Sequence, residues 1–120
     1  MPVLEEVLTQ FETWLRDDQD RSEITIKAYL ADLQLFMTWY APKVGIAADL
    51  LQVTPTHIKN YRKFLTDEQY KKATSVNRRI AALRTFFKWA AMADHIGRSP
   101  VNGLKPLRQQ ATAPRWLEPL

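Results

Sequence analysis

Apolar residues recur along this chain at the alternating three- and four-residue spacing of amphipathic helices. Only three glycines and few β-branched runs add to the prediction of an all-α fold. Pro42 is expected to end the second helix, because a proline disrupts a helix interior. The predicted helices cover residues 3–16, a second stretch from between Ser22 and Thr25 to Tyr40, a third from Thr54 to about Glu68, and a fourth within residues 71–91.

Two segments lack this periodicity. Residues 43–53 are predicted to form a loop with one short turn around Ala48. Residues 105–120 contain three prolines and begin with a basic stretch, which is typical of a linker. The sequence therefore predicts a helical domain over residues 1–104, followed by a linker tail that is disordered after about Leu107.

The second and fourth predicted helices share a pattern at an offset of 50 residues. About half of this agreement follows from aligning any two amphipathic helices in phase. The remainder predicts two helical hairpins that are built alike, with Lys27 and Asn77 in equivalent places. The identical positions are Ala31/Ala81, Leu33/Leu83, Phe36/Phe86 and Trp39/Trp89.

The net charge of +4 is distributed unevenly along the chain. Residues 1–20 carry one arginine against six acids, whereas residues 61–100 carry nine basic residues against three acids. A positive field confined to one half favours a polyanion as the partner of one face. The sequence has no cysteine and no apolar run that approaches a membrane span, which fits a cytoplasmic protein without disulfides.

Many of the polar and basic residues gather at the start of the fourth predicted helix. Thr74 and Ser75 stand where an N-cap residue belongs, directly before an apolar stripe. A helix start that offers hydroxyls, free amides and cations suits phosphates and base edges. The alternative is a solvated helix face, the usual role of a charge run. The cations and the amide of this region are Lys71, Lys72, Asn77, Arg78, Arg84 and Lys88.

Neither a catalytic centre nor a metal site is predicted. The two histidines stand 38 positions apart without a nearby pair of acids, so they do not form a metal site. The chain contains no glycine-rich phosphate loop and no nucleophile with a suitable base, and no cofactor is expected. Most tyrosines lie on or beside apolar stripes and are interpreted as packing residues, as are Trp14, Trp39 and Trp89.

Three motifs follow one another along the chain: Thr25-x-x-x-Tyr29-x-x-Asp32-Leu33-x-x-Phe36-x-x-Trp39, then Ala73-Thr74-Ser75-x-Asn77-Arg78-x-x-Ala81-x-Leu83-Arg84-x-Phe86-Phe87-x-Trp89, then Pro100-Val101-x-x-Leu104 before a basic stretch. Their order and spacing resemble the N-terminal core-binding (SAM-like) domain of tyrosine recombinases, which include phage integrases and Xer-type recombinases. The resemblance covers nearly the whole chain.

The resemblance implies a four-helix orthogonal bundle of two hairpins that grips one side of duplex DNA. In the family, a separate C-terminal domain closes the other side of the clamp. There, a tyrosine attacks a phosphodiester with the help of two arginines, a lysine and histidines. This chain is therefore expected to be a non-catalytic fragment, whose partners are double-stranded DNA and, in the full-length parent, other recombinase protomers.

One short motif imitates the catalytic signature of the same family. His95-Ile96-Gly97-Arg98 spells His-x-x-Arg, but the nucleophilic tyrosine of the family lies downstream of that motif, and no tyrosine follows Arg98. We therefore assign no catalytic residue. His95 is interpreted as the end of a helix, where the helix dipole favours a partly positive side chain.

The predicted DNA-binding residues fall into two groups. Asn77 and Arg78 are the candidates for base edges, because asparagine suits adenine and arginine suits guanine. Thr25 and Lys27 are expected to do equivalent work from the second helix. The alternative function is a helical protein-interaction module whose basic face meets an acidic partner. The residues assigned to phosphate are Lys71, Lys72, Thr74, Ser75, Arg84 and Lys88.

Overall fold

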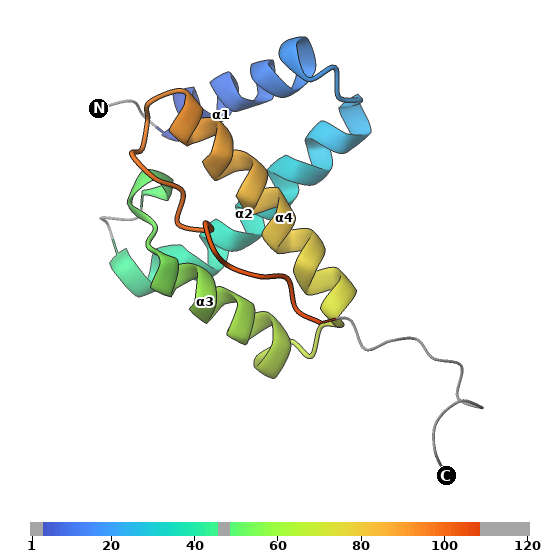
Figure 1. The fold of residues 1–120 in the computed structure, drawn as a ribbon, viewed down its shortest axis with the longest axis vertical. Helices are drawn as coiled ribbons and strands as arrows, with labels where there is room; N and C mark the ends of the chain where they lie inside the picture. Colours follow the sequence, from blue (N-terminus) through green and yellow to red (C-terminus); the bar gives the residue numbers. More distant parts are fainter. Residues whose placement is uncertain (1–3, 46–48, 109–120) are drawn as a thin grey trace, which may run out of the picture.

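The computed structural model describes residues 4–45 and 49–108, and all regular structure within them is helical. The four α-helices form two hairpins whose long helices, α2 and α4, cross at the centre of the domain (Figure 1). The predicted all-α bundle of two hairpins is confirmed. In chain order the elements are α1 (Leu4–Thr13), η1 (Trp14–Asp18), α2 (Glu23–Val44), η3 (Leu50–Gln52), α3 (Pro55–Lys63), η4 (Phe64–Glu68) and α4 (Ala73–Met92).

The 50-residue repeat extends to the whole hairpins. The helices α1 and α3 both widen into a five-residue π turn, after which the amide of Gln19 or Gln69 donates to the carbonyl five residues earlier. The next residue, Asp20 or Tyr70, is in the left-handed region with φ of 50° or 51°. Counterparts lie 50 positions apart, so both hairpins turn the chain by the same backbone route.

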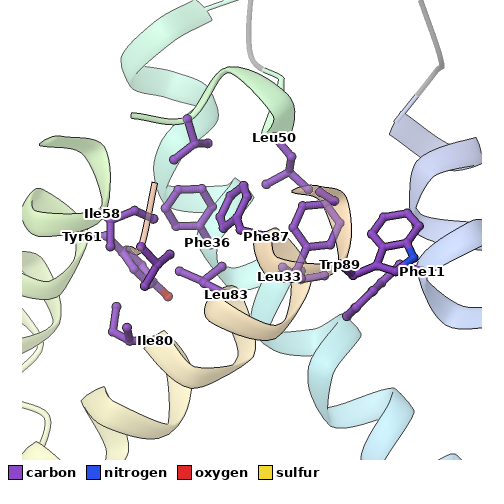
Figure 2. Close-up of a cluster of buried hydrophobic side chains, with 14 of the residues drawn as sticks. Phe11, Leu33, Phe36, Leu50, Ile58, Tyr61, Ile80, Leu83, Phe87 and Trp89 are labelled. Atoms are coloured by element: carbon purple, nitrogen blue, oxygen red, sulfur yellow. The ribbon is translucent and has the colours of Figure 1, made fainter. Parts of the chain in front are cut away.

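An aromatic core ties each hairpin to the other. Phe11 of α1 meets Phe86 of α4 edge to face, with ring centroids 5.2 Å apart, and Tyr61 of α3 meets Phe36 of α2 in the same way at 5.0 Å. All four side chains are buried. Figure 2 shows this cluster, with Phe11 beside Trp89. Because the first helix of each hairpin packs on the long helix of the other, the two hairpins share one core.

The tryptophans take the core positions that the sequence predicts. Trp89 is buried, and Trp14 and Trp39 are half-buried against the same cluster. Tyr70 is an exposed tyrosine, with 85% of its surface accessible, because it occupies the turn before α4.

The predicted end of the second helix is wrong. The helix α2 continues through Pro42 to Val44 and ends at Gly45, whose φ of 74° is readily adopted by glycine. A proline in the last turn removes a single helical hydrogen bond, and the half-buried Val44 packs against the core. The turn expected around Ala48 falls outside the described residues.

The predicted N-cap of the fourth helix is also wrong. The helix α4 begins at Ala73, so Thr74 and Ser75 lie inside its first turn, and the N-cap position belongs to Lys72. The hairpin turn places Lys72 where the first hairpin has Ser22, the true N-cap of α2. The route of the turn, rather than the nearest hydroxyl, therefore decides where α4 starts. By contrast, the predicted Thr54 cap of α3 is confirmed.

The segment after α4 runs back between α3 and α4 towards the start of α4 (Figure 1). Leu104 and Leu107 are half-buried and pack against the core. The sequence predicts a linker from residue 105, but residues 105–107 are docked on the domain. The tail whose disorder we predict lies almost wholly beyond residue 108, outside the described residues. Among the described residues, no helix has the length and apolar character needed to cross a membrane.

The buried hydroxyl of Tyr61 has no hydrogen-bond partner among the described residues. Burial is the main cause that raises the pKa of Tyr61, while the Arg79 guanidinium, which is near the hydroxyl but not in hydrogen-bonding geometry with it, lowers the pKa in part. A phenol with a raised folded-state pKa contributes stability that is present below its unfolded pKa of about 10 and is lost as the pH rises through the folded value.

We expect Tyr61→Phe to leave the free energy of unfolding unchanged at pH 7, or to raise it by up to about 1 kcal/mol, because no bond is broken. The variant should also reduce the loss of stability above about pH 10. Urea unfolding across this pH range measures both effects, with Tyr70→Phe at the exposed position as the control. A loss above about 2 kcal/mol at neutral pH would show that the hydroxyl is bonded after all.

Candidate nucleic-acid interface

The start of α4 combines cations with amides that lack a side-chain cap. Lys72 occupies the N-cap position of α4, but its side chain has no hydrogen-bond acceptor and cannot cap the amides of the first turn. At the start of α2, by contrast, Ser22 Oγ accepts a hydrogen bond from the Thr25 amide at 3.2 Å. In the described part of the chain, no carboxylate lies within 4.0 Å of the ammonium group of Lys71 or Lys72. Free amides, unpaired ammonium groups and the positive end of the helix dipole make this start suited to an anion.

The other predicted DNA-binding residues lie at different distances from this start. Thr74 and Arg78 are exposed, and Ser75 is half-buried. Lys88 is exposed but stands ten residues after Arg78, which is about 15 Å further along the helix. Figure 1 shows that α2 and α4 begin on the same side of the domain.

The start of α2 differs in charge. Thr25 is half-buried and Lys27 is exposed there, but acidic residues of the preceding turn surround the helix start in the sequence. Arg16 donates two hydrogen bonds to Glu23, at 2.6 and 3.0 Å. This contact is the main cause that lowers the pKa of Glu23. The start of α4 is therefore better suited to an anion than the start of α2.

Arg78 is tied to the neighbouring long helix. Its Nη1 donates to Oδ2 of Asp32 in α2 at 2.7 Å. The Asp32 side chain is only 5% exposed, whereas that of Arg78 is 58% exposed. The ion pair fixes one guanidinium nitrogen at the crossing of α2 and α4, while much of the group remains open to solvent. An arginine held in this way keeps donors for a second acceptor.

Asn77 is engaged by the chain itself. Its Nδ2 donates to the Leu107 carbonyl at 2.9 Å, and its Oδ1 accepts from the Leu107 amide at 2.8 Å. Adenine recognition by asparagine uses the same two atoms. Both polar atoms of the Asn77 amide are occupied by Leu107, so base reading by Asn77 stays a prediction that requires Leu107 to move.

Two arginines complete the hold on residues 104–107, which we call the docked segment. Arg84 of α4 donates to the Leu104 carbonyl at 2.7 Å, and Arg62 of α3 donates to the Lys105 carbonyl at 2.8 Å. Arg84, which the sequence assigns to phosphate, is thus a ligand of the protein's own backbone. The docked segment is held from both sides of the groove between α3 and α4.

Two of these roles were not predicted from the sequence. Asp32 belongs to one of the three motifs, but nothing in that motif shows that it meets Arg78. Arg62 is one base among several near the end of α3. The 50-residue repeat offered one hint, because it places Arg62 and Glu12 at equivalent positions of the two first helices. The opposite charges at these positions mark a difference between the two hairpins.

Residues 8–94 match the family described as the phage integrase N-terminal SAM-like domain. The chain belongs to this family. The resemblance seen in the three motifs is thereby confirmed. The match ends shortly after α4, so the docked segment lies outside the matched residues.

Curated relatives of this SAM-like domain are tyrosine recombinases. Tyrosine recombinase XerC of Pediococcus pentosaceus is 27% identical over 111 residues, which cover 92% of this chain and 36% of the relative. A tyrosine recombinase of Pseudothermotoga lettingae is 27% identical over 117 residues (97% and 40%). XerD of Ralstonia nicotianae is 30% identical over 104 residues (87% and 32%). The chain thus spans between about a third and two fifths of these proteins. No solved structure gave a significant match.

In the His-x-x-Arg motif of this SAM-like domain, the histidine is engaged in contacts within the fold. The ring of His95 is hydrogen-bonded to Oε1 of Gln10 in α1 at 2.9 Å and lies 5.3 Å from the Trp89 ring. Arg98 is exposed in the loop that follows. His95 therefore joins the end of α4 to α1.

Asn77→Ala removes both bonds to Leu107 and should release the docked segment locally. Two hydrogen bonds are worth about 1–2 kcal/mol together, so we expect the Leu107 amide to exchange about 5- to 30-fold faster. Amide hydrogen exchange measures this directly. Lys88→Ala, at an exposed position of the same helix, is the control and should leave Leu107 unchanged. Equal exchange in Asn77→Ala and the unmodified chain would contradict the role of Asn77.

Proposed function

We propose that this chain is the DNA-binding domain of a tyrosine recombinase and that it holds duplex DNA through the starts of α2 and α4. The proposal rests above all on the basic start of α4 in a SAM-like domain of the phage integrase family; among the residues that the structure describes, this start has no side-chain cap and no carboxylate partner. Strand cleavage and rejoining would belong to another part of the recombinase, and this chain would need no cofactor. Its partners would be cytoplasmic double-stranded DNA and, in the full-length protein, other protomers.

In the proposed interface, the start of α4 provides the stronger contact with DNA and the start of α2 the weaker one. Lys71, Lys72 and the free amides of the first turn bind phosphates, assisted by the hydroxyls of Thr74 and Ser75. Thr25 and Lys27 in α2 add a weaker contact, because acids surround that helix start. Lys88 meets the backbone further along α4. A helix start pointed into the major groove is a common position for a reading helix.

Arg78 is the proposed reader of a base edge. Asp32 holds one of its nitrogens, and the free part of the guanidinium has the fork geometry that matches two acceptors of guanine. Asn77 is assigned to the docked segment, because both its polar side-chain atoms bond Leu107. Arg84 bonds the Leu104 carbonyl through Nη2 and keeps other donors for a phosphate.

Binding to duplex DNA should weaken linearly in a plot of log affinity against log salt, with a slope of about −0.9 per phosphate neutralised. Lys71→Ala and Lys72→Ala should each reduce the slope by about one unit. Arg98→Ala removes the same charge beyond the far end of α4 and should leave the slope unchanged. Fluorescence anisotropy with one labelled duplex at several salt concentrations measures the three variants.

Absence of duplex binding at about 50 mM salt would overturn the DNA assignment and favour an acidic protein as the partner of the basic face. An equal loss of slope in Arg98→Ala would show that binding follows net charge and not the start of α4.

Arg78→Ala should cost roughly 1–3 kcal/mol on a preferred site and relax the preference at one base position. Asp32→Asn keeps the side-chain shape and Arg78 itself, but it removes the charge that orients the guanidinium. We expect it to shift base preference in the same direction with a smaller loss of affinity. Lys71→Ala should weaken all duplexes by a similar factor.

A binding screen over randomised duplexes at one salt concentration compares these variants, and thermal unfolding checks that each remains folded. If Arg78→Ala and Lys71→Ala shift every sequence by the same factor, α4 only clamps the DNA backbone.

A further inference from the structure

The two hairpins differ in what fills their grooves. The groove between α3 and α4 holds the docked segment, whereas a groove of about 490 Å³ between α1 and α2 is open among the described residues. Its lining includes Leu8, Leu30 and Met37, and Glu12 and Gln34 also line it. None of its lining residues is among the residues proposed to contact DNA at the starts of α2 and α4.

The open groove is the repeat counterpart of the filled one. Arg62 and Arg84, which hold the docked segment, stand 50 positions after Glu12 and Gln34, which line the open groove. The apolar lining residues correspond in the same way, in the pairs Leu8/Ile58, Leu30/Ile80 and Met37/Phe87. Since both hairpins follow the same backbone route, the two grooves correspond at these positions, although Lys27, the counterpart of Asn77, does not line the open groove.

The apolar side chains of the open groove are less buried than their counterparts in the filled groove. Ile58, Ile80 and Phe87 are at most 4% exposed. Their counterparts in the open groove are only half-buried. In the second hairpin Leu104 and Leu107 add apolar cover by packing against the core. Leaving the equivalent apolar side chains in contact with water is unfavourable, so the open groove is suited to a cover of the same kind.

The rims of the two grooves carry different charges. The filled groove has Arg62 on α3, whereas the open groove has Glu12 at the equivalent place on α1, with Arg16 Nη1 3.8 Å from Oε2 of Glu12. Gln34 stands where Arg84 stands and can donate to a backbone carbonyl as Arg84 does. The open groove therefore favours a basic segment that brings apolar side chains.

We propose that the groove between α1 and α2 binds an extended, basic segment of a partner protein that presents two leucines three residues apart. Leu104-Lys105-Pro106-Leu107 is the pattern for this segment, because it occupies the equivalent groove of the same fold. The leucines cover the half-buried apolar side chains of the groove. The cation meets Glu12, and Gln34 donates to the backbone of the segment.

A synthetic peptide with the sequence of residues 101–108, Val-Asn-Gly-Leu-Lys-Pro-Leu-Arg, is the probe for this site. Titrated without DNA into the methyl-labelled chain, it should produce saturable shifts of the Leu8, Leu30 and Met37 methyl signals. Met37→Lys places a charge in the groove and should abolish these shifts. Gln34→Ala is the milder variant at an exposed position and should weaken binding in a chain that still folds.

Two matched peptides test the chemistry of the segment. The peptide with Lys105→Glu should bind about two- to fivefold more weakly, the range expected for one exposed ion pair. The peptide with alanine at both leucine positions should not bind. Equal binding of the Lys105→Glu peptide would overturn the basic character that we assign to the partner.

Three further outcomes would overturn the proposal. The first is the absence of saturable shifts at the three methyl signals with millimolar peptide. The second is a set of shifts confined to Ile58, Ile80 and the docked segment, which would mean that the peptide only competes in the filled groove. The third is self-association of the chain that Met37→Lys removes, which would make a second copy the occupant. None of these measurements involves DNA, so the proposed DNA binding stands or fails separately.

Discussion

Edge-to-face contacts of Phe11 with Phe86 and of Tyr61 with Phe36 join the two hairpins into one domain. Each joins the first helix of one hairpin to the long helix of the other. Such pairs add about 0.5–1.5 kcal/mol to the burial of their rings and also restrict ring geometry. They hold α2 and α4 in the crossed arrangement that brings Arg78 to Asp32.

The two hairpins follow the same backbone path but differ in the chemistry of their surface side chains. At the start of the long helix, the first hairpin has the capping hydroxyl of Ser22, and the second has Lys72 without a cap. The first hairpin is acidic around this turn, whereas the second presents Lys71 and Lys72, which meet no carboxylate among the described residues. Because the fold tolerates these exchanges on its surface, a nearly symmetric core carries a basic helix start on one hairpin and, in the described part of the chain, an open apolar groove on the other.

Polar residues on different faces of α4 have different partners. Arg78 points towards α2 and remains largely open to solvent, whereas Asn77 and Arg84 bond the docked segment. The docked segment runs back along α4, so the chain passes Asn77 as it leaves the described fold. The last described residues therefore lie beside the first turns of α4, close to the proposed contact with DNA.

The helical class, the two similar hairpins, the Thr54 cap and the family could be predicted from the sequence, because these follow from local spacing and from motifs within single helices. The continuation of α2 past Pro42, the start of α4 at Ala73, and the partners of Asn77 and Arg78 depend instead on tertiary contacts. Asn77 meets Leu107 across 30 positions, and Arg78 meets Asp32 across 46. Helical periodicity carries no information on contacts at such separations, since the crossing of α2 and α4 and the return of the chain along α4 bring these residues together.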